Sequence, residues 1–313
     1  MNAGIFAEWL RCQGYTVKKT ESSYWYNAFP KVYQAFPYNW LIDPSEEELR
    51  ELLCENRAIA LRYSTKLEKP IGHISYHIVY NKDSYSLNDL KSTHRRNARI
   101  GLKNCIVEPI SFERMAEEGF YLELDTLKRQ KRKGRLDKKS WRNRFLSASE
   151  LPGFEPWGAI VDGRLAATIF TFQAEDCCHL LFHQSNRKYL KARVNNALTF
   201  EVTKSMVERK KNWLLNYGLH SLDAPQSVDN FKFRMGYEPM EVRQRVVFHP
   251  SLKKFINKLS YKGVVQLLKF NKESHILAKA EGMTRFYLEG KLKIEMQKWP
   301  QCLIDRKQSL LKY

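Results

Sequence analysis

The pattern of apolar and polar positions between residues 177 and 237 predicts a series of strands and helices. An apolar run at 177–184 predicts a strand, a polar turn follows, and Asn195 and Asn196 open a helix. A second strand is predicted at 213–217, and a short helix ends on the segment 231–237. This order can form an α/β ligand cleft, because the amino-terminus of a helix faces anions and diverging strand ends leave room for a ligand.

A hairpin precedes this stretch. Two strand-like runs, at 157–161 and 164–172, are joined by Asp162 and Gly163. An Asp-Gly pair adopts the positive φ angles of a type I′ turn, which connects antiparallel strands. Together with the strand at 177–184, the sequence therefore predicts three consecutive antiparallel strands.

Basic helical segments flank the predicted strands. The segment 92–103 places Arg95, Arg96 and Arg99 on one side of a helix, a core-facing helix opens at Ser111, and another restarts at Ser140. The densest charge run lies between these last two helices and continues into the second. It comprises Lys128, Arg129, Lys131, Arg132, Lys133, Arg135, Lys138, Lys139, Arg142 and Arg144. Such segments either contact an anionic ligand or form a solvated face, and both interpretations stay open.

The outer parts of the chain are predicted as packing elements. They are an amphipathic helix near residues 5–10, an aromatic loop at 24–40, a helix capped by the segment 43–46, and strands at 58–63, 71–80 and 240–248. An aromatic loop can also stack on bases or sugars, but burial is the commoner use of these side chains.

The last segment, 251–313, is helical in pattern and rich in lysine. Its apolar and lysine positions fit a helix that packs on its own domain and also one that lies on an anionic bilayer. No apolar run approaches the roughly 20 residues of a membrane-spanning helix, and residues 1–15 lack the pattern of a signal peptide. We therefore expect a cytoplasmic protein, with peripheral membrane contact as an alternative.

Composition adds a strong positive charge to this picture. The 313 residues carry a formal net charge of +19 yet remain 43% hydrophobic, which indicates a folded basic protein with an anionic partner. Cofactor phosphates, tRNA, another nucleic acid and an acidic membrane all fit that charge. The six cysteines have no zinc-binding spacing, so reduced thiols are expected and no metal is predicted.

The order of these elements, with the Asp162-Gly163 hairpin before the ligand strand, resembles the GNAT acyltransferase fold and its FemAB/BioF2-like branch. The resemblance covers residues 92–250 and rests on the arginine-rich opening at 93–103, the hairpin, the segment 195–198 and the closing segment 231–237. It implies an α/β (α+β) fold with a mostly antiparallel sheet flanked by helices. Three domains are expected: a degenerate GNAT-like half at 1–91, the GNAT domain at 92–250, and a basic helical extension at 251–313.

The resemblance implies an enzyme that transfers an acyl group from acyl-CoA to an amine, on a sugar or a cell-envelope precursor. The strand at 177–184 would pair with the pantetheine arm, and the next helix would take the pyrophosphate. The expected binding residues are Val194, Asn195, Asn196, Ala197 and Arg187. The glycine-rich pyrophosphate loop of the family is absent between residues 185 and 198.

The expected catalytic residues are Lys232, His183 and Tyr217. Lys232 stands where many GNAT enzymes have a tyrosine, and it is suited to an oxyanion or a phosphate. His183 is the first candidate for the general base, on the same side of its strand as His179, with Tyr217 and Asp223 as alternatives.

Two other functions stay open at this stage. FemAB enzymes take an aminoacyl group from tRNA instead of CoA, and a non-catalytic basic module could bind nucleic acid or a membrane surface through the charge run. The positive charge of the chain is compatible with each of them.

Overall fold

The computed structural model describes residues 3–129, 137–174, 176–210, 213–222, 226–271 and 273–311. The chain forms two compact units that are each built from segments far apart in the sequence. Unit 1 comprises Met1–Gly14, Ile78–Gly218 and Pro225–Glu238, and unit 2 comprises Tyr15–His77, Leu219–Ala224 and Pro239–Tyr313. The expected division into three consecutive domains stays a prediction.

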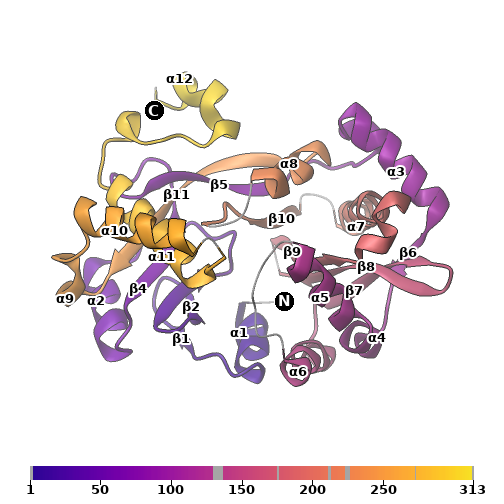
Figure 1. Cartoon of the computed structure of the whole chain (residues 1–313), viewed down its shortest axis with the longest axis horizontal. Coiled ribbons are helices and arrows are strands. Elements are labelled where there is room, and N and C mark those ends of the chain that lie inside the picture. Colours follow the sequence, from indigo (N-terminus) through magenta and orange to yellow (C-terminus); the bar gives the residue numbers. More distant parts are fainter. Residues whose placement is uncertain are drawn as a thin grey trace. The chain divides into compact units, whose positions relative to one another are not determined.

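Unit 1 is built on a mostly antiparallel group of strands (Figure 1). These are β6 (Ile106–Pro109), β7 (Phe154–Val161), β8 (Arg164–Gln173), β9 (Cys177–Ser185) and β10 (Leu214–Leu219). They pair in that order, antiparallel from β6 to β9 and parallel between β9 and β10. Asp162 and Gly163 connect β7 to β8 with φ angles of 49° and 76°, which confirms the predicted hairpin.

Helices cover both faces of these strands. They are α1 (Ala3–Cys12), α3 (Ser92–Asn104), α4 (Phe112–Glu117), α5 (Gly119–Arg129), α6 (Lys138–Ser149), α7 (Val194–Arg209) and α8 (Gln226–Arg234), with the 3₁₀ helices η1 (Leu87–Asp89) and η2 (Arg187–Ala192). Aromatic rings from α1, α4 and α6 surround Phe170 of β8 on one face, and α7 lies on the other face (Figure 1). The single helix predicted from Ser111 is divided, because α4 ends at Glu117 before α5 begins.

Unit 2 has its own strands, and one of them corrects an expectation. They are β1 (Val17–Lys19), β2 (Tyr24–Phe29), β3 (Val32–Phe36), β4 (Ala60–Thr65), the first part of β5 (His73–Tyr80), and β11 (Glu238–Phe248). The aromatic loop expected at 24–40 is wrong for residues 24–36, which form the antiparallel pair β2–β3. Alternation along these strands buries Trp25 in a cluster with Tyr33, which explains the aromatic content.

The helices of unit 2 are α2 (Glu46–Glu55), α9 (Pro250–Lys253), α10 (Lys258–Phe270), α11 (His275–Glu289) and α12 (Lys307–Leu310), with η3 (Ile294–Met296) and η4 (Gln301–Arg306). Ser45, within the predicted capping segment 43–46, caps α2 by accepting a hydrogen bond from the Glu48 N–H at 3.0 Å. In α11, Met283 and Phe286 pack against Phe248 of β11. Among the described residues, no helix is long and apolar enough to cross a bilayer.

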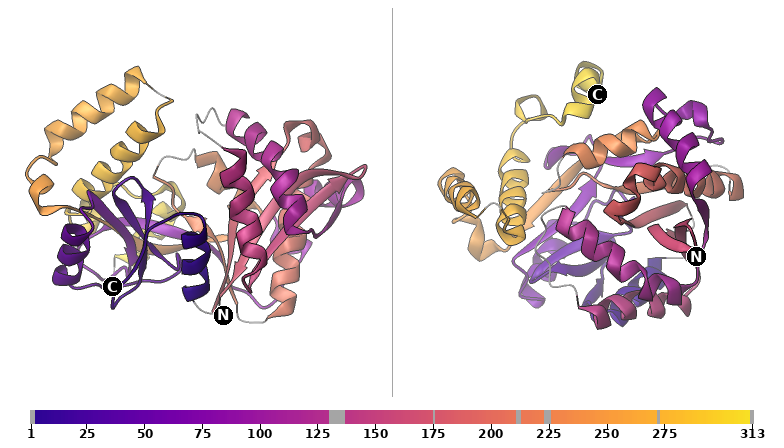
Figure 2. Two further views of the ribbon diagram at one scale, coloured as in Figure 1. Left: turned by 90° about the horizontal axis from the view of Figure 1, so that it is seen from below. Right: turned by 45° about the vertical axis from the view of Figure 1, so that its right-hand side comes forward.

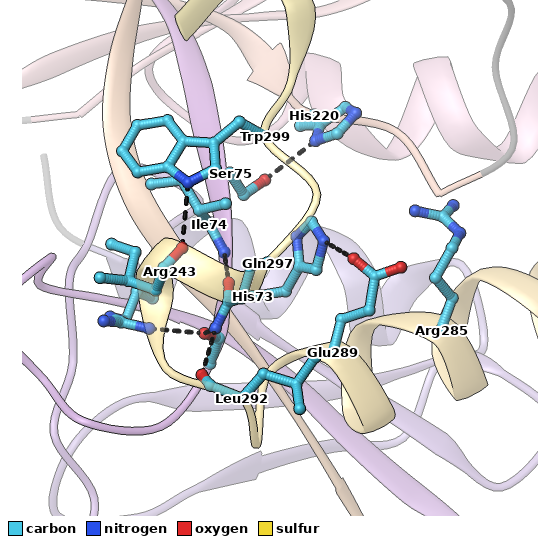
Figure 3. A network of polar contacts seen from close by, with 12 residues as sticks. His73, Ile74, Ser75, His220, Arg243, Arg285, Glu289, Leu292, Gln297 and Trp299 are labelled. Carbon is cyan, nitrogen blue, oxygen red and sulfur yellow. Dashed lines mark hydrogen bonds and ion pairs between the residues drawn. The ribbon is translucent and has the colours of Figure 1, made fainter. Parts of the chain in front are cut away.

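A buried polar network attaches the chain after α11 to the start of β5 (Figure 3). His73 Nε2 donates to the Glu289 carboxylate at 2.7 Å. Gln297 accepts from the Ile74 N–H at 2.7 Å and donates to the Gly72 carbonyl at 3.1 Å. The same carbonyl accepts a hydrogen bond from Arg243 at 2.8 Å. The carboxy-terminal segment is therefore a structural part of unit 2.

Two helical glycines test the packing of α3 against α7. A Cβ at Gly101 of α3 would lie 2.6 Å from the Arg193 carbonyl oxygen and 2.8 Å from Ala197 Cβ, whereas nothing lies within 4 Å at Gly263 of α10. We expect Gly101→Ala to lower the free energy of unfolding by about 1–2 kcal/mol, because α3 must move away from α7. The matched control Gly263→Ala should raise it by about 0.5–1 kcal/mol. Urea unfolding followed by circular dichroism measures both, and a Gly101→Ala protein of native stability would contradict the close contact.

Candidate active site

The candidate site lies where β9 and β10 separate. Their parallel pairing ends at His179 and Asn216, although β9 continues to Ser185 and β10 continues to Leu219, with a φ of 120° at Gly218. A pocket of about 190 Å³ opens beside the separated strand ends. It is lined by Thr126, Arg129, His183, Ser185, Asn195, Tyr217, Val228, Phe231 and Lys232.

A bulge in β9 decides which histidine reaches this pocket. Phe182 pairs with Phe170 and Leu180 pairs with Thr171, so Leu181 is an extra residue in β9. An extra residue reverses the face to which the following side chains point. His179 stacks on Phe172 on one face, and His183 lines the pocket on the other. The expectation that the two histidines share a side is therefore wrong.

His183, Tyr217 and Asn195 form a hydrogen-bonded chain. His183 Nε2 lies 3.2 Å from Asn195 Oδ1, which can only accept, so this nitrogen carries the proton. His183 Nδ1 then accepts from the Tyr217 hydroxyl at 2.6 Å. Burial lowers the pKa of His183 to about 4, with a further lowering by Lys232 and Arg129, so the ring is neutral at pH 7. Burial also raises the pKa of Tyr217, which keeps its hydroxyl protonated.

Lys232 reaches the same pocket from α8. Its Nζ donates to the Tyr217 carbonyl oxygen at 2.8 Å and lies 3.8 Å from the buried carboxylate of Asp229. Burial lowers the pKa of Lys232, while the charge of Asp229 opposes that shift. An ammonium group has three N–H donors, so the two neighbours orient the group and leave a third donor for a ligand in the pocket.

The amino-terminus of α7 places the other expected binding residues. Arg193 precedes the helix with a φ of 63° and makes no side-chain cap, and Asn195 lines the pocket. Val194 and Ala197 are buried, and Asn196 donates to Met235 Sδ at 3.3 Å. Their side chains therefore pack inside. The Asn196 and Ala197 N–H groups donate to the Arg193 carbonyl at 3.0 and 3.2 Å, so a ligand contact would use the N–H groups of Val194 or Asn195.

Arg187 lies apart from this group. Its guanidinium Nε and backbone N–H both bind the Asp125 carboxylate, at 2.7 and 2.8 Å. The structure thus brings together Lys232, His183, Tyr217 and Asn195, and it assigns Arg187 to an ion pair on η2 outside the pocket lining.

Arg129 is a site residue that the sequence did not single out. Its Nη2 donates to Ser185 Oγ at 3.1 Å, and burial lowers its pKa. It belongs to the long charge run, and the sequence alone does not distinguish it from the other lysines and arginines of that run. Arg142 pairs with Glu117 and Arg144 with Gln13. Residues 130–136 of the run and the alternative base Asp223 lie outside the described residues.

The pocket combines two cations with a neutral histidine–tyrosine pair. Arg129 and Lys232 line it together, so the site favours a ligand that carries or develops negative charge. Within the described part of the chain, no group of three His, Cys, Asp or Glu side chains is placed to hold a metal ion.

Comparison with solved structures identifies the fold. FemX matches with a TM-score of 0.55 and 12% identity over 80% of this chain and 92% of its own. The C-terminal domain of a candidate lysylphosphatidylglycerol synthetase from Agrobacterium fabrum matches with a TM-score of 0.51 and 12% identity, over 79% of this chain and 87% of that domain. A tandem GNAT protein from the clavulanic acid biosynthesis pathway is also similar, at a TM-score of 0.46 and 12% identity over 74% of this chain and 81% of its own.

No protein-family model matches the chain, and the curated proteins include no matching sequence. At 12% identity the similarity concerns the fold alone. The expected mixed α/β fold with a mostly antiparallel sheet flanked by helices is confirmed, and it is similar to the fold of FemX. The degenerate amino-terminal half and the basic extension stay predictions.

The buried histidines predict acid sensitivity. Burial lowers the pKa of His179 and of His183 to about 4, against 6.5 for an unperturbed histidine. Between pH 6.5 and 4 the unfolded chain binds more protons at these sites, so each histidine costs up to about 1.4 kcal/mol of stability per pH unit as the pH falls. We expect the free energy of unfolding, measured with urea, to fall less steeply between pH 7.5 and 4.5 in His183→Gln than in the native protein. Identical pH dependence in both proteins would contradict a neutral buried His183.

Proposed function

We propose that the protein is an acyltransferase that moves an acyl group from an activated donor to an amine in the pocket between β9 and β10. The observation that carries this proposal is the position of Lys232. Its ammonium group is oriented by Tyr217 and Asp229 at the separated strand ends, with a third donor available to a ligand. A preoriented donor of this kind stabilises the charge that develops during acyl transfer.

The reaction follows from ordinary acyl-transfer chemistry. The amine nitrogen attacks the donor carbonyl, a C–N bond forms, and the carbonyl oxygen becomes an oxyanion that accepts a hydrogen bond from Lys232. The bond to the leaving group then breaks, and the leaving thiolate or alkoxide takes up the proton that the amine has lost. Arg129 adds a second positive charge to the pocket.

The proton is handled by the pair His183 and Tyr217 in this proposal. The Tyr217 oxygen accepts the proton of the amine while its own proton passes to His183 Nδ1 across the 2.6 Å hydrogen bond. Because burial holds the pKa of His183 near 4, the imidazolium readily gives this proton back for delivery to the leaving group. His183 is therefore a relay base rather than a lasting proton acceptor.

Acyl-CoA is the first donor that we propose. The separated end of β9 beyond the bulge would accept the pantetheine arm, and the uncapped amino-terminus of α7, at Val194 and Asn195, would take the pyrophosphate. The acceptor amine would belong to a sugar or a cell-envelope precursor, as the resemblance to the FemAB branch implies.

Aminoacyl-tRNA is the second donor, favoured by a specific observation. Between β9 and α7 the chain forms the 3₁₀ helix η2 in place of a glycine-rich loop, with Lys188 and Lys191 exposed. Exposed cations on the segment that joins β9 to α7 suit an RNA backbone, and the Phe231-Lys232 pair resembles the FemAB form.

Substitution of Lys232 tests the transfer role. We expect Lys232→Met to lower the transfer rate by about 10²–10³-fold, the usual effect of removing an oxyanion donor. The assay follows a labelled acetyl group from acetyl-CoA, or a labelled amino acid from aminoacyl-tRNA, to a panel of amino sugars and peptide amines. Lys204→Met is the matched control, because Lys204 lies on the exposed side of α7 and pairs with Glu208.

The same assay separates the candidate functions. Transfer from acetyl-CoA alone selects the CoA donor, and transfer from aminoacyl-tRNA alone selects the FemAB-type donor. Native rates in Lys232→Met, or salt-sensitive RNA binding without transfer from either donor, would overturn the proposal in favour of a basic binding module.

A further inference from the structure

Helix α10 packs through one side only. Tyr261 donates to Glu281 of α11 at 2.8 Å, and Val264, Val265 and Leu268, at helical spacing from Tyr261, are half-buried. None of the α10 side chains is buried. Figure 2 shows α10 beside α11, on the side of α11 away from the strands of unit 2. The opposite side of α10 is therefore open within this unit.

Large apolar side chains line the open side. Leu259 and Phe270 are 79% and 86% exposed, and Leu267 is 56% exposed. At 3.6 residues per turn these three lie along one stripe of the helix, opposite the side that packs on α11. Phe255, which is 60% exposed, precedes the helix by three residues. Single exposed apolar residues are common, but three along one stripe of a helix mark an interaction surface.

Lysines form a second stripe beside the apolar one. Lys258, Lys262 and Lys269 occupy neighbouring positions on the helical wheel, between the stripe and the side that packs on α11. Lys253 and Lys254 flank Phe255, with Lys254 Nζ 5.1 Å from its ring centroid. The sequence contains no aspartate or glutamate between residues 242 and 272. The apolar stripe is therefore bordered by uncompensated positive charge.

We propose that residues 253–270 dock this protein on an anionic lipid bilayer, with α10 lying in the plane of the interface. The apolar stripe would enter the boundary between headgroups and acyl chains, and the lysine row would meet lipid phosphates. This surface is independent of the transfer pocket and does not rest on the proposed acyl transfer.

The chemistry of the surface favours a bilayer over the other occupants. A nucleic acid would contact the lysines but would leave Leu259, Leu267 and Phe270 exposed to water. A second copy of the same face would bury the apolar stripe but would bring two lysine rows together. An anionic bilayer would bury the apolar stripe and would place lipid phosphates beside the lysines.

Vesicle co-sedimentation of the full chain tests the proposal. We expect binding to vesicles of phosphatidylcholine with about one third phosphatidylserine, and at least about tenfold weaker binding to phosphatidylcholine alone. Leu259→Gln with Phe270→Gln should weaken binding to the anionic vesicles by about tenfold or more, because both side chains are exposed and their loss leaves the fold intact. Lys262→Glu with Lys269→Glu should have a similar effect.

Ile106→Gln is the matched control, because Ile106 is an exposed apolar residue of β6, far from α10 in the sequence. Its binding should equal that of the native protein. Vesicle binding that survives the Leu259 and Phe270 substitutions would overturn the proposal. Two other results would also overturn it. In the first, the native protein does not bind vesicles but forms a dimer, which the Leu259 and Phe270 substitutions convert to a monomer. In the second, the native protein binds tRNA but not vesicles, and the Lys262 and Lys269 substitutions abolish tRNA binding.

Discussion

The hydrogen bond from Lys232 Nζ to the Tyr217 carbonyl is the interaction on which the candidate site depends. It joins β10 to α8 next to Gly218, a residue of β10 with a φ of 120°. Asp229, one turn before Lys232 on the same helix, supplies the opposite charge. A buried ammonium group without these two partners would lose its proton or leave the pocket. The same strand end holds the Tyr217 hydroxyl against His183, so one short segment positions both the cation and the proton relay.

Much of the fold could be predicted because its signals are local. The Asp162-Gly163 turn, the caps at Ser111 and Ser45, and the period of the apolar runs each depend on a few neighbouring residues. These features specify strands and helices before any tertiary contact forms. The segment 231–237 is likewise local, and its resemblance to the closing motif of FemAB-like enzymes made Lys232 a site candidate.

The remaining features depend on contacts between distant segments. The bulge at Leu181 changes which face His183 occupies, and it is fixed by pairing with β8 rather than by the sequence of β9 alone. Arg129 is held in the pocket by its hydrogen bond to Ser185, a residue 56 positions away in the sequence. The pattern of charges around Arg129 could therefore not identify it as a site residue. The alternation of the chain between two units has the same origin, because α1 packs through Trp9 on Phe154 and Phe170 of unit 1.

The central claim is that Lys232 binds the oxyanion of the transfer reaction more strongly than the uncharged donor carbonyl. It is tested most directly by comparing the dissociation constants of a phosphonate analogue of the tetrahedral intermediate and of its planar amide counterpart, in the native protein and in Lys232→Met. The account predicts that the native protein prefers the phosphonate by about 10²-fold or more, and that Lys232→Met loses this preference while it keeps its affinity for the amide. An unchanged preference in Lys232→Met would contradict the account.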